Sequence, residues 1–346
     1  VGKSTLFNAL TNSSKAQAEN FPFCTIDPNI GLVPVPDERL DKLTSISNSK
    51  KKIYTTISFV DIAGLVKGAS KGEGLGNKFL SHIREVDAII HMIRCFDSDD
   101  IQNVNSSVDP IRDLEIIETE MKLADLESIQ KRIDKKNKKN IDNLELNLLE
   151  KAKDLINNDK DLKILESEFK QKDLIKSGLL TIKPKLYVCN VDEESIEKGN
   201  KYTEKFINKF SEKNTLIISA EIENQINQLG NENEKKKYMK MINMRETGLN
   251  SLIRKGYELL SLETFFTSGS EESRAWTITK NCIAPKAAGE VHTDFEKGFI
   301  RAETVSYKDF VENNGWIKSK ESGKMRLEGK DYIVKDGDIL NFRFNT

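Results

Sequence analysis

The sequence predicts an α/β protein with a parallel sheet, an inserted antiparallel helical hairpin and a small C-terminal domain of short strands. Three observations support this fold class. A glycine-lysine-serine motif at the start of the chain precedes a helical pattern. Strand-like and helical segments then alternate along much of the chain, and short strands separated by turns fill its last part.

Composition limits the classes of protein to consider. A chain of 346 residues is long enough for two or three domains and a sizeable core. The formal net charge is −1, so no strong overall charge indicates a nucleic-acid partner. No apolar run approaches the roughly 20 residues of a membrane span, so we expect a cytoplasmic protein without a membrane partner. The four cysteines lie far apart without a C-x-x-C pair, which favours thiols in a reducing compartment: Cys24, Cys95, Cys189 and Cys282.

The chain begins with the closing half of a phosphate-binding loop. Val1-Gly2-Lys3-Ser4-Thr5 matches the end of the pattern G-x-x-x-x-G-K-[ST], while the first glycine and the strand before it are absent. All five are candidate nucleotide-binding residues, because backbone N–H groups of such a loop hold phosphate oxygens. Lys3 would reach the β- and γ-phosphates and act in catalysis, and Ser4 would ligate Mg²⁺. These residues alone are equally compatible with a polar helix start that carries an incidental lysine.

A helix is expected over residues 4–12, and the next strand over residues 53–60, which are β-branched and aromatic. That strand ends in Asp61-Ile62-Ala63-Gly64, a D-x-x-G motif that strengthens the phosphate-loop interpretation. Asp61 would hold Mg²⁺, and the Gly64 N–H would meet the γ-phosphate. Thr25, in the loop between the two motifs, is placed to give Mg²⁺ a second hydroxyl ligand; the alternative is an ordinary loop threonine.

A long helical segment interrupts the predicted sheet. After a buried strand within residues 86–96, residues 110–178 place apolar side chains at spacings of three and four. A charged tract divides this segment, so we expect an antiparallel helical hairpin inserted into the α/β domain. The tip carries Lys135, Lys136, Lys138 and Lys139. They form either a solvated turn, which is the commoner case, or a nucleic-acid contact.

The next two strands end in candidate base-reading loops. Asn190-Val191-Asp192-Glu193 follows the strand at 185–189, where GTPases carry N-K-x-D. The aspartate of that motif accepts two hydrogen bonds from guanine, and adenine lacks both donors. Val191 and Glu193 replace the lysine and the aspartate, so the loop argues against strict use of GTP and permits ATP. Asn190 would fix the loop or contact the base, and Ser219-Ala220-Glu221 fits the last base-contacting loop.

From about residue 262 the pattern changes to short strands separated by turns. Strands are expected at 275–278, 298–303, 331–334 and 339–344, and Lys335-Asp336-Gly337-Asp338 marks a turn between the last two. A compact mixed β domain of about 80 residues is therefore predicted.

With these motifs in place, the chain resembles the YchF family, also called Obg-like ATPases, in the translation-factor class of P-loop GTPases. The resemblance covers essentially the whole chain. In its first part it rests on Gly2–Thr5, Asn20–Asn29, Asp61–Ala69, Arg94–Phe96 and Asn190–Glu193. In its last part it rests on His292–Glu303 and Tyr332–Asp338.

The resemblance implies three parts. These are an OBG-type G domain over residues 1–109 and 180–261, a helical coiled-coil insert over 110–179, and a C-terminal TGS domain of β-grasp, ubiquitin-like fold over 262–346. The sheet of the G domain is then that of a P-loop NTPase. The resemblance also implies hydrolysis of ATP in preference to GTP, dependence on Mg²⁺, and association with ribosomes. A monomer is the default expectation.

Hydrolysis is expected to be slow. The position after D-x-x-G, where Ras-like enzymes carry a glutamine that orients water, is Leu65. The resemblance implies a histidine that acts on the water, but the matching position here is Asn103. An asparagine can orient water and cannot act as a base near neutral pH. His82, His91 and His292 are expected to be structural or surface residues.

Three functions stay open at this point. They are a slow ATPase switch that reports its nucleotide state to the ribosome, a GTP-using translation factor, and a ribosome-binding module whose hydrolysis is vestigial. The base-reading loop favours the first. Because the chain as given starts inside its phosphate loop, we also expect these 346 residues to bind ATP poorly and the full-length protein to bind it well.

Overall fold

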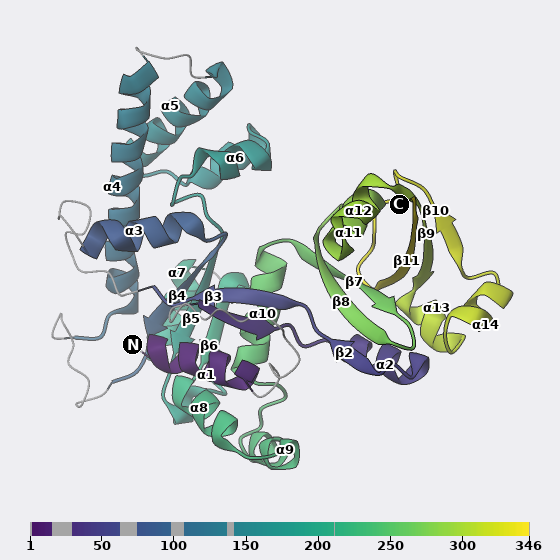
Figure 1. Ribbon diagram of the computed structural model, residues 1–346. Helices are drawn as coiled ribbons and strands as arrows, with labels where there is room; N and C mark the ends of the chain where they lie inside the picture. The colour runs from purple at the N-terminus through teal and green to yellow at the C-terminus, as the bar shows by residue number, and fades with distance from the viewer. Residues whose placement is uncertain are drawn as a thin grey trace. The chain divides into compact units, whose positions relative to one another are not determined.

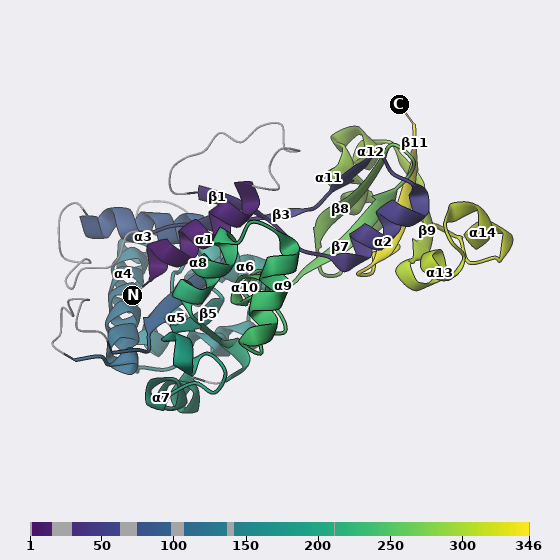
Figure 2. The same ribbon diagram turned by 90° about the horizontal axis from the view of Figure 1, so that it is seen from below.

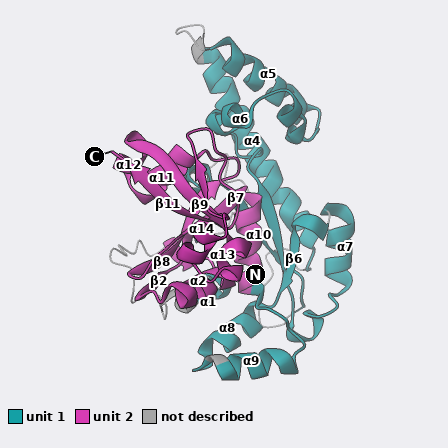
Figure 3. Ribbon diagram, turned by 90° about the vertical axis from the view of Figure 1, so that its right-hand side faces the viewer, with its two compact units in different colours: residues 1–9, 60–248 teal, residues 10–59, 249–346 magenta. Residues whose placement is uncertain are grey.

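The computed structural model describes residues 2–15, 30–62, 75–97, 107–136, 142–210 and 212–345 (Figure 1). By its internal contacts the chain divides into two compact units (Figure 3). The first unit holds residues 1–9 and 60–248, and the second holds residues 10–59 and 249–346. Among the described residues, no helix is both long and apolar enough to span a lipid bilayer.

A parallel three-stranded sheet lies at the centre of the first unit. Its strands are β4 (Ile89–Arg94), β5 (Lys185–Asn190) and β6 (Thr215–Ile218), in that order. They are mostly apolar and helices pack against them, as a parallel sheet requires. Around the sheet lie α1 (Lys3–Lys15), which begins in this unit, α3 (Leu75–Glu85), α4 (Pro110–Lys136), α7 (Lys201–Phe210), α8 (Ala220–Gln228) and α9 (Glu232–Met241). The parallel α/β sheet predicted from the sequence is confirmed.

The predicted antiparallel helical hairpin is also confirmed. Its arms are α4 and α5 (Asn143–Asn157), followed by the 3-10 turn η2 (Leu162–Ser167) and α6 (Gln171–Ser177) (Figure 1). Cross-arm contacts show the opposite directions of the two helices: Lys122 Nζ contacts Asp159 at 2.5 Å and Lys153 Nζ donates to Gln130 Oε1 at 2.6 Å. Leucine and isoleucine side chains fill the space between the arms. Lys138 and Lys139, and the side chains of Lys135 and Lys136, lie outside the described residues.

A buried carboxylate fastens α4 to the chain that enters β5. Asp125 is fully buried, and its two oxygens accept hydrogen bonds from the backbone N–H groups of Leu180 and Thr181, each at 2.9 Å. Thr181 Oγ1 donates a third at 2.6 Å. Burial raises the pKa of the Asp125 carboxyl, against the lowering effect of these donors. The helical insert is therefore joined to the sheet by hydrogen bonds as well as by apolar packing.

The second unit is built on a six-stranded mixed sheet. Its strand order is β10 (Arg326–Glu328), β9 (Phe299–Ser306), β11 (Asp338–Phe344), β7 (Leu262–Ser268), β8 (Glu272–Thr279) and β2 (Lys51–Ile53). The central pair β11 and β7 is parallel, and antiparallel partners flank it on both sides. This is the arrangement expected of a β-grasp domain, with α11 (Ala284–Val291) packed against the sheet. The remaining helices of the domain are α12 (Thr293–Lys297), α13 (Tyr307–Glu312) and α14 (Trp316–Glu321).

The second unit also contains elements from the first fifth of the chain. Helix α2 (Glu38–Ser47) buries Leu40 and Leu43 completely against Phe266 and Phe310, and β2 runs parallel to β8. A separate two-stranded pair joins β1 (Ile30–Pro34) to β3 (Thr56–Val60), and α10 (Gly248–Leu259) leads into β7. Residues 38–53 fall within the expected G domain by their place in the sequence, and they pack with the C-terminal strands.

Two local expectations need correction. The single strand expected at 53–60 is divided, because Ile53 ends β2 and β3 begins only at Thr56. The strand expected at 331–334 is wrong, since Ile333 forms only an isolated bridge with Ile283. The buried Asp338 carboxylate accepts hydrogen bonds from Tyr332 Oη at 2.6 Å and from Lys335 N at 3.0 Å. The first bond fixes the Tyr332 side chain, and the second belongs to the turn at residues 335–338. Within the expected strand, Tyr332 N donates to Gly329 O at 3.3 Å in a turn.

Candidate nucleotide-binding site

The phosphate-loop motif lies directly against both candidate base-reading loops. Helix α1 begins at Lys3, and the Gly2 carbonyl accepts its first hydrogen bond from Leu6 N at 2.9 Å. Gly2 has a φ of +87°, and a Cβ at this position would lie 2.4 Å from Asn190 Nδ2 and 3.4 Å from Ala220 Cβ. Only glycine accommodates both this backbone conformation and this approach.

Asn190 connects the ends of the three parallel strands. It is the last residue of β5 and is 4% exposed. Its carbonyl accepts from Cys95 N, just beyond β4, at 2.8 Å, and its Oδ1 accepts from Ala220 N, just beyond β6, at 2.9 Å. Ligands of open α/β sheets bind outside the carboxyl ends of the strands. Gly2, Asn190 and Ala220 meet at that edge.

Lys3 and Asp61 form an ion pair. The Lys3 amine contacts the Asp61 carboxylate, with side chains 38% and 20% exposed. The two motifs are 58 residues apart in the chain, so this contact is the tertiary arrangement that a phosphate loop and a D-x-x-G motif require.

The donors at this point suit Mg²⁺. Ser4 adjoins Lys3 in the first turn of α1, and Lys3 contacts the Asp61 carboxylate, so the Ser4 hydroxyl and this carboxylate are the two oxygen ligands that the described residues would offer Mg²⁺. Mg²⁺ is usually held by one or two carboxylates together with phosphate and water rather than by a protein cage. No group of three or more His, Cys, Asp or Glu suited to a metal occurs among the described residues. Thr25, the third expected ligand, lies outside them.

Two side chains of the candidate base-reading loop after β5 point in different directions. Val191 is 3% exposed and packs in the sheet core with Ile93 and Phe206, so its side chain faces inward. Glu193 is exposed and accepts a hydrogen bond from Gln225 Nε2 at 2.8 Å. Gln225 belongs to no motif, and no local signal in the sequence pointed to it.

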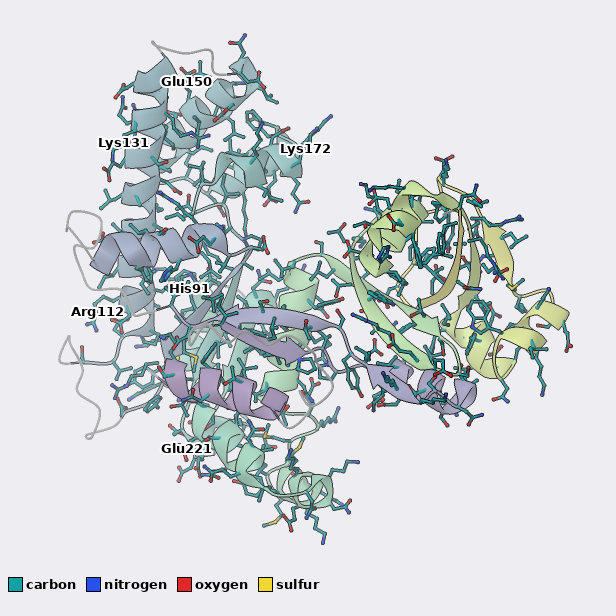
Figure 4. The ribbon with its side chains drawn as sticks, in the orientation of Figure 1. His91, Arg112, Lys131, Glu150, Lys172 and Glu221 are labelled. Carbon is teal, nitrogen blue, oxygen red and sulfur yellow. The ribbon has the colours of Figure 1, made fainter. Side chains whose placement is uncertain are left out.

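The loop after β6 contributes a hydroxyl and a carboxylate. Ser219 occupies the N-cap position of α8 without a side-chain capping bond and is 1% exposed, and its buried Oγ has no hydrogen-bond partner among the described residues. A ligand with a polar group would satisfy this atom. Glu221 is exposed in the first turn of α8 (Figure 4). Four other candidate site residues lie outside the described part of the chain: Val1, Thr25, Gly64 and Asn103.

His91 takes no part in this site. Its side chain on β4 is 6% exposed and stacks on Tyr187, with ring centroids 5.7 Å apart. Burial, with a smaller contribution from Lys185, lowers the pKa of His91 to about 3. The imidazole is therefore neutral at physiological pH and enclosed in the sheet.

Comparison with known proteins adds to this geometry. A family model described as "50S ribosome-binding GTPase" matches residues 1–124. The YchF-GTPase C-terminal model, described as "Protein of unknown function (DUF933)", matches residues 262–345. The protein named "Ribosome-binding ATPase YchF" of Bacillus subtilis is 49% identical over 356 residues, which cover 100% of this chain and 97% of that protein. This chain belongs to the YchF family.

Two further YchF proteins support this assignment to the family. The "Ribosome-binding ATPase YchF" of Escherichia coli O157:H7 is 48% identical over 354 residues, with the same coverage. The solved structure titled "Structure of the Schizosaccharomyces pombe YchF GTPase" is 35% identical, has a TM-score of 0.83, and matches 99% of this chain and 95% of that one. The resemblance noted from the motifs is thereby confirmed. As a YchF protein, the chain is an enzyme of the P-loop nucleoside-triphosphatase class.

Proposed function

We propose that this YchF protein binds ATP with Mg²⁺, hydrolyses it slowly and in preference to GTP, and reports its nucleotide state to the ribosome in the cytoplasm. The observation that carries the proposal is the approach of Gly2 to Asn190 and Ala220. It brings the phosphate-binding motif and the two base-reading loops to one edge of the sheet. The relatives named as ribosome-binding ATPases support the choice of nucleotide and partner.

The chain's own residues account for phosphate binding. The first N–H groups of α1 carry the positive end of the helix dipole, which favours the β- and γ-phosphates. The Lys3 amine would leave its ion pair with Asp61 and pair with these phosphates instead. When bound, Mg²⁺ neutralises the charge that develops on the phosphates, with Ser4, Thr25 and Asp61 as its proposed protein ligands. The Gly64 N–H is proposed to contact the γ-phosphate.

The preference for ATP follows from the base-reading loop. A guanine-specific site accepts hydrogen bonds from N1–H and the 2-amino group, and a buried aspartate supplies both acceptors. Here the carboxylate belongs to Glu193, which is exposed and already bonded to Gln225. Asn190 holds the Ala220 loop instead of a base. Guanine would therefore lose much of its usual recognition, while adenine does not depend on it.

Slow turnover is expected from the residue types at the two motif positions that would act on the attacking water. Leu65 cannot hydrogen-bond water, and Asn103 can orient it without taking its proton. If Asn103 limits the rate, Asn103→His raises kcat for ATP in the full-length protein. An unchanged kcat would show that another step or another group is limiting.

The proposal is tested by competition between ATP and GTP on the full-length protein. Titration calorimetry with each nucleotide and Mg²⁺ is expected to show tighter binding of ATP, and single-turnover assays are expected to show slow release of phosphate. A tenfold or greater preference for GTP would instead support a GTP-hydrolysing translation factor. The match of residues 1–124 to a GTPase family model keeps that second candidate in view.

Ribosome binding is tested by co-sedimentation with and without a non-hydrolysable ATP analogue. A switch binds ribosomes to different extents in the two conditions. Equal binding in both would favour a ribosome-binding module with vestigial hydrolysis. We propose that the active form is monomeric, which sedimentation of the free protein checks.

A further inference from the structure

The side chain of Glu193 is held by residues that belong to no nucleotide-binding motif. Gln225 Nε2, on α8, donates to Glu193 Oε1 at 2.8 Å, and Tyr238 Oη, on α9, donates to Gln225 Oε1 at 2.5 Å. Helices α8 and α9 lie side by side (Figures 1 and 2). A continuous hydrogen-bonded chain thus runs from the base-reading loop through α8 to α9.

The direction of these hydrogen bonds is fixed by chemistry. An ionised carboxylate only accepts, so the amide nitrogen of Gln225 must face Glu193. The amide oxygen then faces Tyr238, whose hydroxyl must donate. Tyr238 therefore fixes the orientation of the Gln225 amide, and Gln225 fixes the carboxylate.

The backbone beneath Glu193 is already fixed by other bonds. Val191 N donates to Ile218 O at 3.0 Å, and Asp192 Oδ1 accepts from Ser195 N at 2.9 Å. These bonds do not determine the direction of the Glu193 side chain. Glutamate has one more methylene than aspartate, so its carboxylate can turn in more directions. The bond to Gln225 turns its carboxylate toward α8 and occupies one of its two oxygens.

We propose that Gln225, oriented by Tyr238, is a positioning residue that sets the purine selectivity of the site. This inference rests on the proposed function, because it assumes that the loop Asn190–Glu193 faces the base. Guanine would need both carboxylate oxygens, one for N1–H and one for the 2-amino group, whereas adenine presents neither donor. Holding Glu193 against α8 therefore weakens GTP binding and leaves ATP binding nearly unchanged.

The main test is the substitution Gln225→Met, which keeps the length of the side chain and removes both hydrogen bonds. Binding of ATP and of GTP to the full-length protein is measured by calorimetry. We expect GTP to bind about 3- to 10-fold more tightly than in the wild type, because the Glu193 carboxylate no longer has to break its hydrogen bond to Gln225. The affinity for ATP should change less than about twofold. Tyr238→Phe should shift the ratio in the same direction by about twofold. Gln228→Met, an exposed position on the same helix, should change nothing.

A double-mutant cycle separates this role from a structural one. In a Glu193→Ala background, Gln225→Met should no longer alter the ratio of ATP to GTP affinity, because the carboxylate it positions is gone. A ratio unchanged in Gln225→Met alone, or changed equally in both backgrounds, would overturn the inference. So would a crystal structure of Gln225→Met in which Glu193 still turns toward α8. The wild-type ATP-to-GTP ratio tests the proposed function separately, so the two ideas can fail independently.

Discussion

At Gly2 the backbone of the phosphate loop comes so close to Asn190 that any side chain there would require Asn190 to move. The motif alone identified this glycine, because a phosphate-binding loop is formed by residues that are adjacent in the sequence. The sequence could not indicate what Gly2 would touch, since Asn190 and Ala220 are far along the chain. Gln225 was missed for a different reason: a glutamine in the middle of an amphipathic helix looks like any exposed helical residue.

The substitution Gly2→Ala should weaken ATP binding at least tenfold. The new Cβ would lie 2.4 Å from Asn190 Nδ2, and Asn190 would have to move and release Ala220 N, which distorts both base-reading loops. The positive φ of Gly2 adds about 1 kcal/mol of strain. Calorimetric titration of the full-length variant measures the loss.

Gly178→Ala is the matched control, since Gly178 also has a positive φ, of +66°, but a Cβ added there would meet no atom within 4 Å. It should lower stability by about 1 kcal/mol and leave nucleotide affinity unchanged. Equal losses of ATP affinity in the two variants would show that contact with Asn190 is unimportant.

His91 should make the protein less stable in acid. Burial lowers its pKa to about 3 in the folded state, below the ordinary value of about 6.5 that it recovers on unfolding. The unfolded chain therefore binds the extra proton first, and stability falls as the pH drops from about 6.5 toward 3. Between pH 7 and pH 5 the loss from this group is about 2 kcal/mol.

Urea unfolding at the two pH values measures this loss, and His91→Phe should remove that part of it while retaining an aromatic ring beside Tyr187. The control His82→Phe changes an exposed helical position and should keep the wild-type pH dependence. A pH dependence identical in wild type and His91→Phe would contradict the assignment.

At the scale of elements, long periodic segments were predicted well and short strands poorly. The helical hairpin was evident because apolar residues recur at helical spacing over many turns. The strand expected at 331–334 failed because Tyr332 N donates to Gly329 O at 3.3 Å within a turn, which leaves a single bridge of Ile333 with Ile283. Strand β7 was not separated from its surroundings, since Leu262–Ser268 follows a helix without a turn signal.

The attachment of the helical hairpin depends on Asp125. Replacing it with alanine would leave the backbone N–H groups of Leu180, which is buried, and of Thr181, which is half-buried, without acceptors. We expect Asp125→Ala to lower the free energy of unfolding by about 2–4 kcal/mol. Denaturant unfolding followed by circular dichroism measures the change.

Asp134→Ala serves as the control on the same helix, because Asp134 is exposed and, among the described residues, accepts a hydrogen bond from Gln130 alone, at 2.8 Å. Its effect should stay within about 0.5 kcal/mol. If both alanine variants are equally stable, the three hydrogen bonds to Asp125 do not hold the insert to the sheet.

At the scale of the whole molecule, chain order and spatial order differ. Composition and turn signals predicted the mixed β domain and its start near residue 262. They could not predict that α2 and β2, more than 200 residues earlier, complete its sheet and core. Leu40 and Leu43 lie on an ordinary amphipathic helix whose sequence does not specify which sheet it covers. The pairing of Lys51–Ile53 with Glu272–Arg274, together with the packing of both leucines against Phe266, decides this.

A fragment of residues 262–345 should therefore fold poorly by itself. Without α2 it would expose the face of the sheet that buries Phe266 and Phe310, and it would lose the complete burial of Leu40 and Leu43. Burial of two leucines contributes about 3–6 kcal/mol, which is a large part of the stability of a domain of this size. The ion pair of Arg39 with Asp336, at 2.6 Å, and the β2 edge would be lost as well.

Joining residues 36–54 to residue 262 through a flexible Gly/Ser linker of about ten residues should restore a cooperative thermal transition. Ile53 pairs with Arg274 and Leu262 pairs with Thr279, five residues further along β8. The linker therefore has to span about 20 Å, which about ten Gly/Ser residues can do. Leu40→Asp with Leu43→Asp in the fused fragment should abolish the gain, because charged side chains cannot replace leucine in that core. If residues 262–345 alone melt at the same temperature as the fusion, α2 only covers a domain that is already complete. A higher and sharper transition in the fusion would mean that the C-terminal domain of this YchF protein folds around a segment from the first fifth of its chain.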